Sequence, residues 1–162
     1  MKKILLLVCV TFILGAATQI SCAQKEALEV GAKAPDFTLQ DIAGQEVSLK
    51  DVLASNKSTL LVFWATWCPS CRREIPELIR LNNEYKSKGL KILTVNLGES
   101  PGKVKSFAEQ QGIEYAVLLD KDNKVGSQYG VMYIPTNILL DKNGMVKYKG
   151  TSPPTEDLLP QK

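Results

Sequence analysis

The stretch of sequence that decides the fold reads Phe63-Trp64-Ala65-Thr66-Trp67-Cys68-Pro69-Ser70-Cys71-Arg72-Arg73-Glu74. Its first two residues end a continuous apolar run, residues 58–64, whose length suits a central strand buried on both faces. Its last residues open a helical pattern, and Pro69 suits the first helical turn because proline lacks an N–H group. Two cysteines therefore lie where a buried strand gives way to a helix.

The spacing of Cys68 and Cys71 suits an intramolecular disulfide that opens and closes. We expect Cys68 to be exposed at the helix entrance and Cys71 to lie one turn in and more buried. The unpaired N–H groups and partial positive charge of a helix N-terminus favour a thiolate at Cys68, and Arg72 and Arg73 add positive charge nearby. The thiolate would attack a substrate disulfide, and Cys71 would then resolve the mixed disulfide.

The composition excludes several other roles for this pair. The chain has no histidine, which removes histidine-ligated metals and catalytic Ser-His-Asp triads. A zinc site would need two more ligands, and haem attachment would need histidine where Arg72 stands. The other cysteines, Cys9 and Cys22, belong to an N-terminal targeting segment. We therefore expect no metal and no cofactor.

Length and charge indicate one soluble domain with its own core. The chain has 162 residues, of which 44% are hydrophobic and 23% are charged. Without Lys2 and Lys3, 18 basic residues stand against 17 acidic ones. This near balance of charge gives no basic surface that would attract nucleic acid, so a nucleic-acid-binding function is not expected.

Residues 1–23 have the layout of a secretory signal. Two lysines are followed by an apolar run that is short for a membrane span, and then by small and polar residues. Three outcomes fit this pattern: a cleaved signal peptide, a retained membrane anchor, or a lipoprotein with lipid on Cys22. Each predicts an exported protein, periplasmic or otherwise extracytoplasmic.

A polar lead-in, residues 24–33, precedes one predicted domain over residues 34–151, and a proline-rich tail over residues 152–162 follows it. Hydrophobic periodicity and turn residues predict strands over 34–39, 45–49, 58–64, 90–97, 116–119, 136–140 and 145–149. They predict helices over 71–88 and 102–111, and one helical turn over 125–129. The alternating central part implies parallel strands with right-handed crossovers.

The stretch 63–74 resembles the active-site segment of thioredoxin-fold proteins, and within them that of the exported TlpA/ResA-type thiol–disulfide oxidoreductases. Ala34-Pro35-Asp36-Phe37 resembles their N-terminal hairpin, and Val95-Asn96-Leu97-Gly98-Glu99-Ser100 resembles a strand end and loop of the ResA group. Residues 129–136 match the position of their cis-proline loop. The resemblance implies an α/β, thioredoxin-like fold: a central mixed sheet flanked by helices, with an N-terminal β-hairpin. The C-terminal helix usual in this fold is expected to be short or absent.

The same resemblance assigns roles to individual residues. Cys68 would be the nucleophile and Cys71 the resolving thiol. Pro135 would be cis, and its loop would face the cysteine pair. Ile134, Pro135 and Thr136 would belong to a substrate groove, in which the Ile134 backbone pairs with an extended substrate segment.

Glu74 is the third residue that the resemblance marks as catalytic. It matches the carboxylate that ResA-type proteins hold near the cysteine pair, whereas ordinary thioredoxins have a buried aspartate at the position of Val62. We expect Glu74 to accept the proton of the resolving thiol or to repel a thiolate by like charge. Trp67 and Pro69 are expected to line the substrate groove, and Trp64 to lie in the core.

These features predict a monomeric reductase that acts on the disulfides of exported proteins and draws electrons from a membrane thiol donor. The resemblance suggests apocytochrome c as one substrate. A peroxiredoxin-like antioxidant is an alternative, but Leu61 and Ala65 stand where such enzymes carry proline and threonine. An oxidant or isomerase of exported disulfides also remains open, because Pro69-Ser70 differs from the dipeptides of many relatives and this dipeptide tunes the redox potential.

Overall fold

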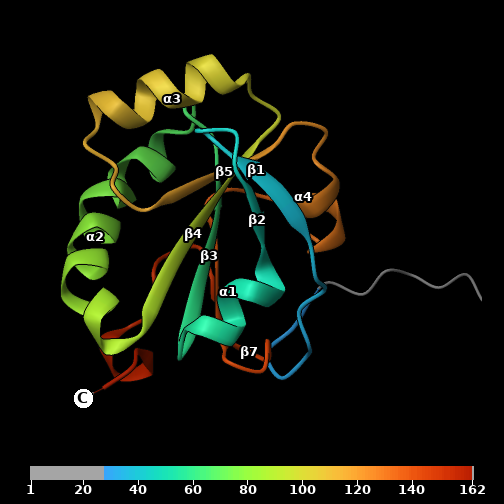
Figure 1. Cartoon of the computed structure of the whole chain (residues 1–162), viewed down its shortest axis with the longest axis vertical. Helices are drawn as coiled ribbons and strands as arrows, with labels where there is room; N and C mark the ends of the chain where they lie inside the picture. Colours follow the sequence, from blue (N-terminus) through green and yellow to red (C-terminus); the bar gives the residue numbers. More distant parts are fainter. Residues whose placement is uncertain (1–27, 162) are drawn as a thin grey trace, which may run out of the picture.

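The computed structural model describes residues 28–161 (Figure 1). The predictions for the targeting segment, including Cys22, lie outside these residues. Within residues 28–161, no helix combines the length and apolar character that a membrane crossing would need.

A seven-stranded mixed sheet forms the centre of the molecule, with strand order β2-β1-β5-β4-β3-β6-β7. Strands β3, β4 and β5 are parallel, whereas β1 and β6 run antiparallel to the inner strands beside them. The arrangement confirms the predicted α/β fold class. The strands, in chain order, are β1 (Thr38–Asp41), β2 (Glu46–Ser48), β3 (Ser58–Trp64), β4 (Leu90–Leu97), β5 (Ala116–Asp120), β6 (Thr136–Asp141) and β7 (Val146–Gly150).

Helices cover both faces of the sheet, as Figure 1 shows with α2 and α3 on one side and α4 on the other. The first face packs against Leu78 and Leu81 of α2 and Val104 of α3, and the second against Leu49 of α1 and Val125 of α4. The helices are α1 (Leu49–Ser55), α2 (Pro69–Tyr85), α3 (Pro101–Gln110) and α4 (Lys124–Gln128), with 3-10 turns η1 (Lys86–Lys88) and η2 (Glu156–Leu158).

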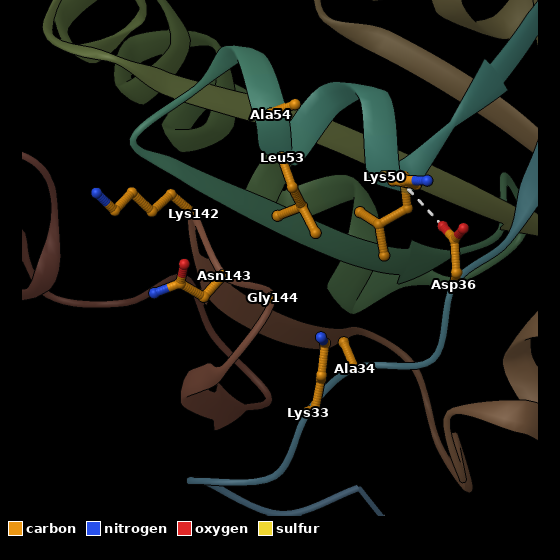
Figure 2. A pocket seen from close by; sticks show the side chains of 10 residues that line it. Lys33, Ala34, Asp36, Lys50, Leu53, Ala54, Lys142, Asn143 and Gly144 are labelled. Atoms are coloured by element: carbon orange, nitrogen blue, oxygen red, sulfur yellow. Dashed lines mark hydrogen bonds between the residues drawn. The ribbon is translucent and has the colours of Figure 1, made fainter.

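Helix α1 was not predicted, and a tertiary contact explains why. It has only seven residues, and the side chain of its N-cap residue, Ser48, makes no capping hydrogen bond. Instead, Asp36 Oδ1 accepts a hydrogen bond of 3.1 Å from the Lys50 backbone N–H in the first turn, as Figure 2 shows. A cap supplied from fourteen residues earlier leaves no local sequence signal.

Most other element boundaries differ from the predictions by one to four residues, and two of these differences have a clear physical reason. The first strand begins at Thr38 rather than at residue 34. Before it, Pro35 has no N–H to give to a ladder, and the Ala34 N–H donates to the Gly144 carbonyl oxygen. The helix predicted from residue 71 begins two residues earlier, at Pro69, in the N1 position that suits proline.

The proline-rich tail carries only the short turn η2. The chain has no regular α-helix after β7 within the described residues. The tail still contributes to the core, because Leu159 is buried against the α2 face of the sheet. Arg80 of α2 forms an ion pair of 2.7 Å with Glu156 and so connects the tail to that helix.

Candidate active site

Cys68 and Cys71 form a disulfide where β3 leads into α2. Their Cα atoms are 5.3 Å apart. Cys68 is the N-cap of α2, and its Sγ accepts a hydrogen bond of 3.2 Å from the Cys71 backbone N–H. The pair therefore lies at the positive end of a 17-residue helix, as predicted.

The expectation that Cys68 is the more exposed cysteine is wrong for this disulfide form. Both cysteines have only 3% of their surface exposed. Cys68 is enclosed because the loop before β6 packs close to it: the Ile134 carbonyl oxygen lies 3.8 Å from Cys68 Sγ. Cys68 does line a surface groove, which gives its sulfur an approach from solvent.

The loop before β6 carries the predicted cis-proline. The Ile134–Pro135 peptide bond is cis, which confirms that prediction. Ile134 is half-buried, whereas Pro135 and Thr136 are buried. The Thr136 hydroxyl donates a hydrogen bond of 2.7 Å to the Tyr133 carbonyl oxygen, which closes the loop on itself.

The groove beside Cys68 has a volume of about 580 Å³ and separates the α2 entrance from the cis-proline loop. Its rim carries three large side chains that are mainly exposed: Trp67 (65%), Met132 (87%) and Tyr133 (59%). None of the residues that line it is charged; they are Trp67, Cys68, Pro69, Ser70, Leu97, Asn123, Val131, Met132, Tyr133 and Ile134. Such a groove suits an uncharged, partly apolar segment.

Glu74 lies one helical turn beyond Cys71 and lines a small cavity with it. Burial removes solvent from the carboxylate and raises the pKa of Glu74 to about 7, and a hydrogen bond from Asn137 partly opposes this rise. The Asn137 Nδ2 lies 3.3 Å from each carboxylate oxygen. A carboxyl group that titrates near neutral pH and adjoins a buried sulfur can exchange protons with it.

Glu99 was not assigned a role from the sequence, yet it holds the segment that leads into Cys68. Its carboxylate accepts hydrogen bonds from the Thr66 N–H (2.6 Å), the Thr66 hydroxyl (2.7 Å) and Asn96 Nδ2 (2.8 Å). Lys103 adds an ion pair of 2.7 Å. Burial alone would raise the pKa of Glu99, but these four contacts outweigh it and lower the pKa to about 2.

A signal for Glu99 was present in the order of the strands. Glu99 follows β4, which is the parallel neighbour of β3. The C-terminal ends of parallel strands meet at one edge of a sheet. Trp64 and Asn96 are register partners at this edge, so the loops that follow them lie together.

Comparison with known proteins agrees with this site. The sequence profile of the AhpC/TSA family matches residues 30–149. The thiol–disulfide oxidoreductase ResA of Geobacillus thermodenitrificans is 43% identical over 124 residues, which cover 76% of this chain and 70% of that protein. The ResA protein of Bacillus subtilis is 36% identical over 137 residues, covering 85% and 75%.

The chain belongs to the ResA-type thiol–disulfide oxidoreductases. Two solved structures share the fold of this ResA-type chain. One is a thiol:disulfide interchange protein, DsbE, from Chlorobium tepidum, with a TM-score of 0.72, 35% identity and coverage of 82% of this chain and 92% of that one. The other is the thioredoxin domain of a thiol–disulfide oxidoreductase from Bacteroides vulgatus, with a TM-score of 0.72, 31% identity and coverage of 82% and 94%.

Proposed function

We propose that this ResA-type oxidoreductase is exported and reduces disulfides in other exported proteins, with Cys68 as nucleophile, Cys71 as resolving thiol and Glu74 as proton acceptor. One observation carries this proposal. The Cys68–Cys71 pair lies at the start of α2, between an uncharged groove and a half-buried carboxyl group whose pKa is raised to about 7 by burial.

The reaction starts from the dithiol form of the protein. The Cys68 thiolate attacks one sulfur of the substrate disulfide, so that the substrate S–S bond breaks and a mixed disulfide forms, and the other substrate sulfur leaves as a thiolate that takes up a proton from solvent. Cys71 loses its proton to Glu74 and attacks Cys68 Sγ, so that the Cys68–substrate S–S bond breaks and the second substrate sulfur leaves as a thiolate that takes up a proton from solvent. The substrate gains two electrons, and the protein is left with the Cys68–Cys71 disulfide.

Each partner of this exchange has a feature that supports it. The Cys71 N–H already donates to Cys68 Sγ in the disulfide form, and the same donor can stabilise a Cys68 thiolate. The rim formed by Trp67, Met132 and Tyr133 offers apolar contact to a substrate segment, and the Ile134 backbone offers a hydrogen-bonding edge beside Cys68. A membrane thiol protein would return the oxidised pair to the dithiol form.

The N-terminal pattern supports export. Residues 1–23 have the order of a targeting signal, and their end allows cleavage, retention as an anchor or lipid on Cys22. Apocytochrome c is one substrate that fits a reductase of this kind. Mass spectrometry of the chain isolated from its host distinguishes the three N-terminal outcomes, and cell fractionation tests export.

Reduction of a model protein disulfide by the pre-reduced chain tests the chemistry. We expect the wild type to reduce it and Cys68→Ala to abolish the reaction, since no other described residue supplies a thiol at the groove. Cys71→Ala should instead accumulate the mixed disulfide on Cys68. Activity that survives Cys68→Ala would rule out the proposed nucleophile.

The midpoint potential of the Cys68–Cys71 pair decides whether the protein reduces disulfides in its substrates or forms them. A strongly reducing value supports the reductase proposal, whereas a value near that of a disulfide-forming oxidase would reverse it.

A further inference from the structure

We propose that Asn137 is a positioning residue that holds Glu74 beside Cys71 and offers a hydrogen-bonding partner to both protonation states of its carboxyl group. This inference rests on the proposed role of Glu74 as proton acceptor.

The contact between Asn137 and Glu74 joins two elements that meet only in the folded protein. Glu74 lies on α2, and Asn137 lies on β6, two residues beyond the cis Ile134–Pro135 bond. The Asn137 Nδ2 is 3.3 Å from both Glu74 oxygens. Asn137 has 0% of its surface exposed, so water cannot replace this amide without opening the core.

The position of Asn137 in the sheet supports a functional role. Asn137 is the register partner of Val62 on the neighbouring strand β3. Every other described residue of β6 between Thr136 and Asp141 is apolar, and a buried amide in a central strand costs free energy unless a partner compensates for it. Glu74 is the side chain that Asn137 contacts through a hydrogen bond, and this contact offsets the cost of burying an amide where an apolar residue would pack more simply.

An amide can serve a carboxyl group in both of its states. When Glu74 is ionised, Asn137 Nδ2 donates to the carboxylate, as the structure shows. When Glu74 is protonated, its O–H needs an acceptor, and among the described residues none donates to Asn137 Oδ1. A half-turn of the terminal amide, whose torsion is soft and roughly two-fold, presents Oδ1 to that O–H. Serine and threonine are shorter, and leucine or valine offers neither atom.

Few other ionisable groups face Glu74. Cys71 precedes it by one turn on α2 and lines the same cavity, as does Tyr115, which comes just before β5. Burial raises the pKa of Tyr115, and the charge on Glu74 raises it further. On β7, burial and then the same charge raise the pKa of Tyr148. Neither tyrosine donates a hydrogen bond to Glu74 in this structure, so Asn137 is the described residue that hydrogen-bonds it.

Titration of the Glu74 carboxyl carbon by NMR tests the inference on the full chain in its disulfide form. The Glu74→Gln variant identifies the resonance. In Asn137→Leu, which is close in size, we expect the titration midpoint to rise by about one pH unit, a tenfold change in proton affinity, because a charge-assisted hydrogen bond is lost. A midpoint equal to that of the wild type would overturn the proposal.

Two additions keep the result interpretable. Asn137→Val, which suits a buried strand, should raise the midpoint in the same way and serves where the leucine variant folds poorly. In the reduced protein, the pH profile of Cys71 alkylation should change in Asn137→Leu but not when Glu74→Gln is already present. An equal change in the Glu74→Gln background would show that Asn137 acts through packing and would overturn the proposal. Because the NMR titration needs no reductase activity, its outcome is independent of whether the proposed function holds.

Discussion

Glu74 should make this protein less stable as the pH rises from about 4.5 to about 7, and Glu74→Gln should remove that dependence. In the folded disulfide form, burial raises the pKa of Glu74 from 4.5 to about 7. Between these two values the folded chain binds more protons at this site than the unfolded chain does. The free energy of unfolding therefore decreases with pH across this window and is highest, for this group, below pH 4.5.

The size of the effect follows from the two pKa values. Each pH unit between them corresponds to about 1.4 kcal/mol, so a fully buried group would contribute about 3 kcal/mol. Glu74 is only half-buried, and solvent screens part of this penalty, which leaves about 1–2 kcal/mol. Glutamine has a similar shape and no charge, so it avoids the cost above pH 7.

Urea unfolding of the oxidised protein at pH 5 and pH 8 measures the effect. The free energy of unfolding of Glu74→Gln, measured relative to that of the wild type, should increase by about 1–2 kcal/mol from pH 5 to pH 8. Glu77→Gln is the matched control on the same helix: Glu77 is exposed and paired with Arg80, which lowers its pKa, so it is ionised at both pH values. If the free energies of unfolding of Glu74→Gln and of the wild type differ by the same amount at pH 5 and at pH 8, the raised pKa of Glu74 is refuted.

Two further predictions concern the residues around the pair. Glu99→Gln should lower the free energy of unfolding by about 2 kcal/mol at pH 7, because Thr66 and Lys103 lose a charged partner. The difference should shrink as the pH falls from 4.5 toward 2, because Glu99 takes up a proton in the unfolded wild type over this range, whereas in the folded protein its pKa is about 2; a constant difference in urea unfolding would contradict this. Trp67→Ala should change stability by less than about 0.5 kcal/mol, because Trp67 is exposed. It should slow reduction of a protein disulfide several-fold without slowing reduction of a small-molecule disulfide, and equal slowing of both would argue against a contact with the substrate protein.

The elements that were predicted correctly have a signal in their own sequence, whereas the missed element depends on a contact with a distant part of the chain. The strands at Ser58–Trp64 and Leu90–Leu97 have the predicted bounds, since a mostly apolar segment of strand length has few other ways to be buried. The turn between the strands predicted over 136–140 and 145–149 contains Gly144, whose φ of +77° is one that glycine adopts readily. Helix α1 was missed, because its first turn is capped by Asp36 from another part of the chain.

By itself, the sequence determined the redox pair, its place at a helix N-terminus and the cis Ile134–Pro135 loop. These depend on short spacings or on a motif, which local chain geometry or family resemblance translates directly into structure.

Only the tertiary structure decided the surroundings of the pair. In the folded protein Cys68 is buried as deeply as Cys71. The Glu99 carboxylate accepts a hydrogen bond from the Thr66 backbone N–H, and Asn137 donates one to Glu74. Each of these contacts joins residues more than thirty positions apart: Thr66 and Glu99 lie in loops that follow neighbouring strands, Cys68 and Ile134 lie at a helix N-cap and in a loop, and Asn137 and Glu74 lie on a strand and a helix. Burial and hydrogen bonding at such a distance depend on how the elements pack, and so does the proton affinity of a carboxyl group beside the reactive sulfur.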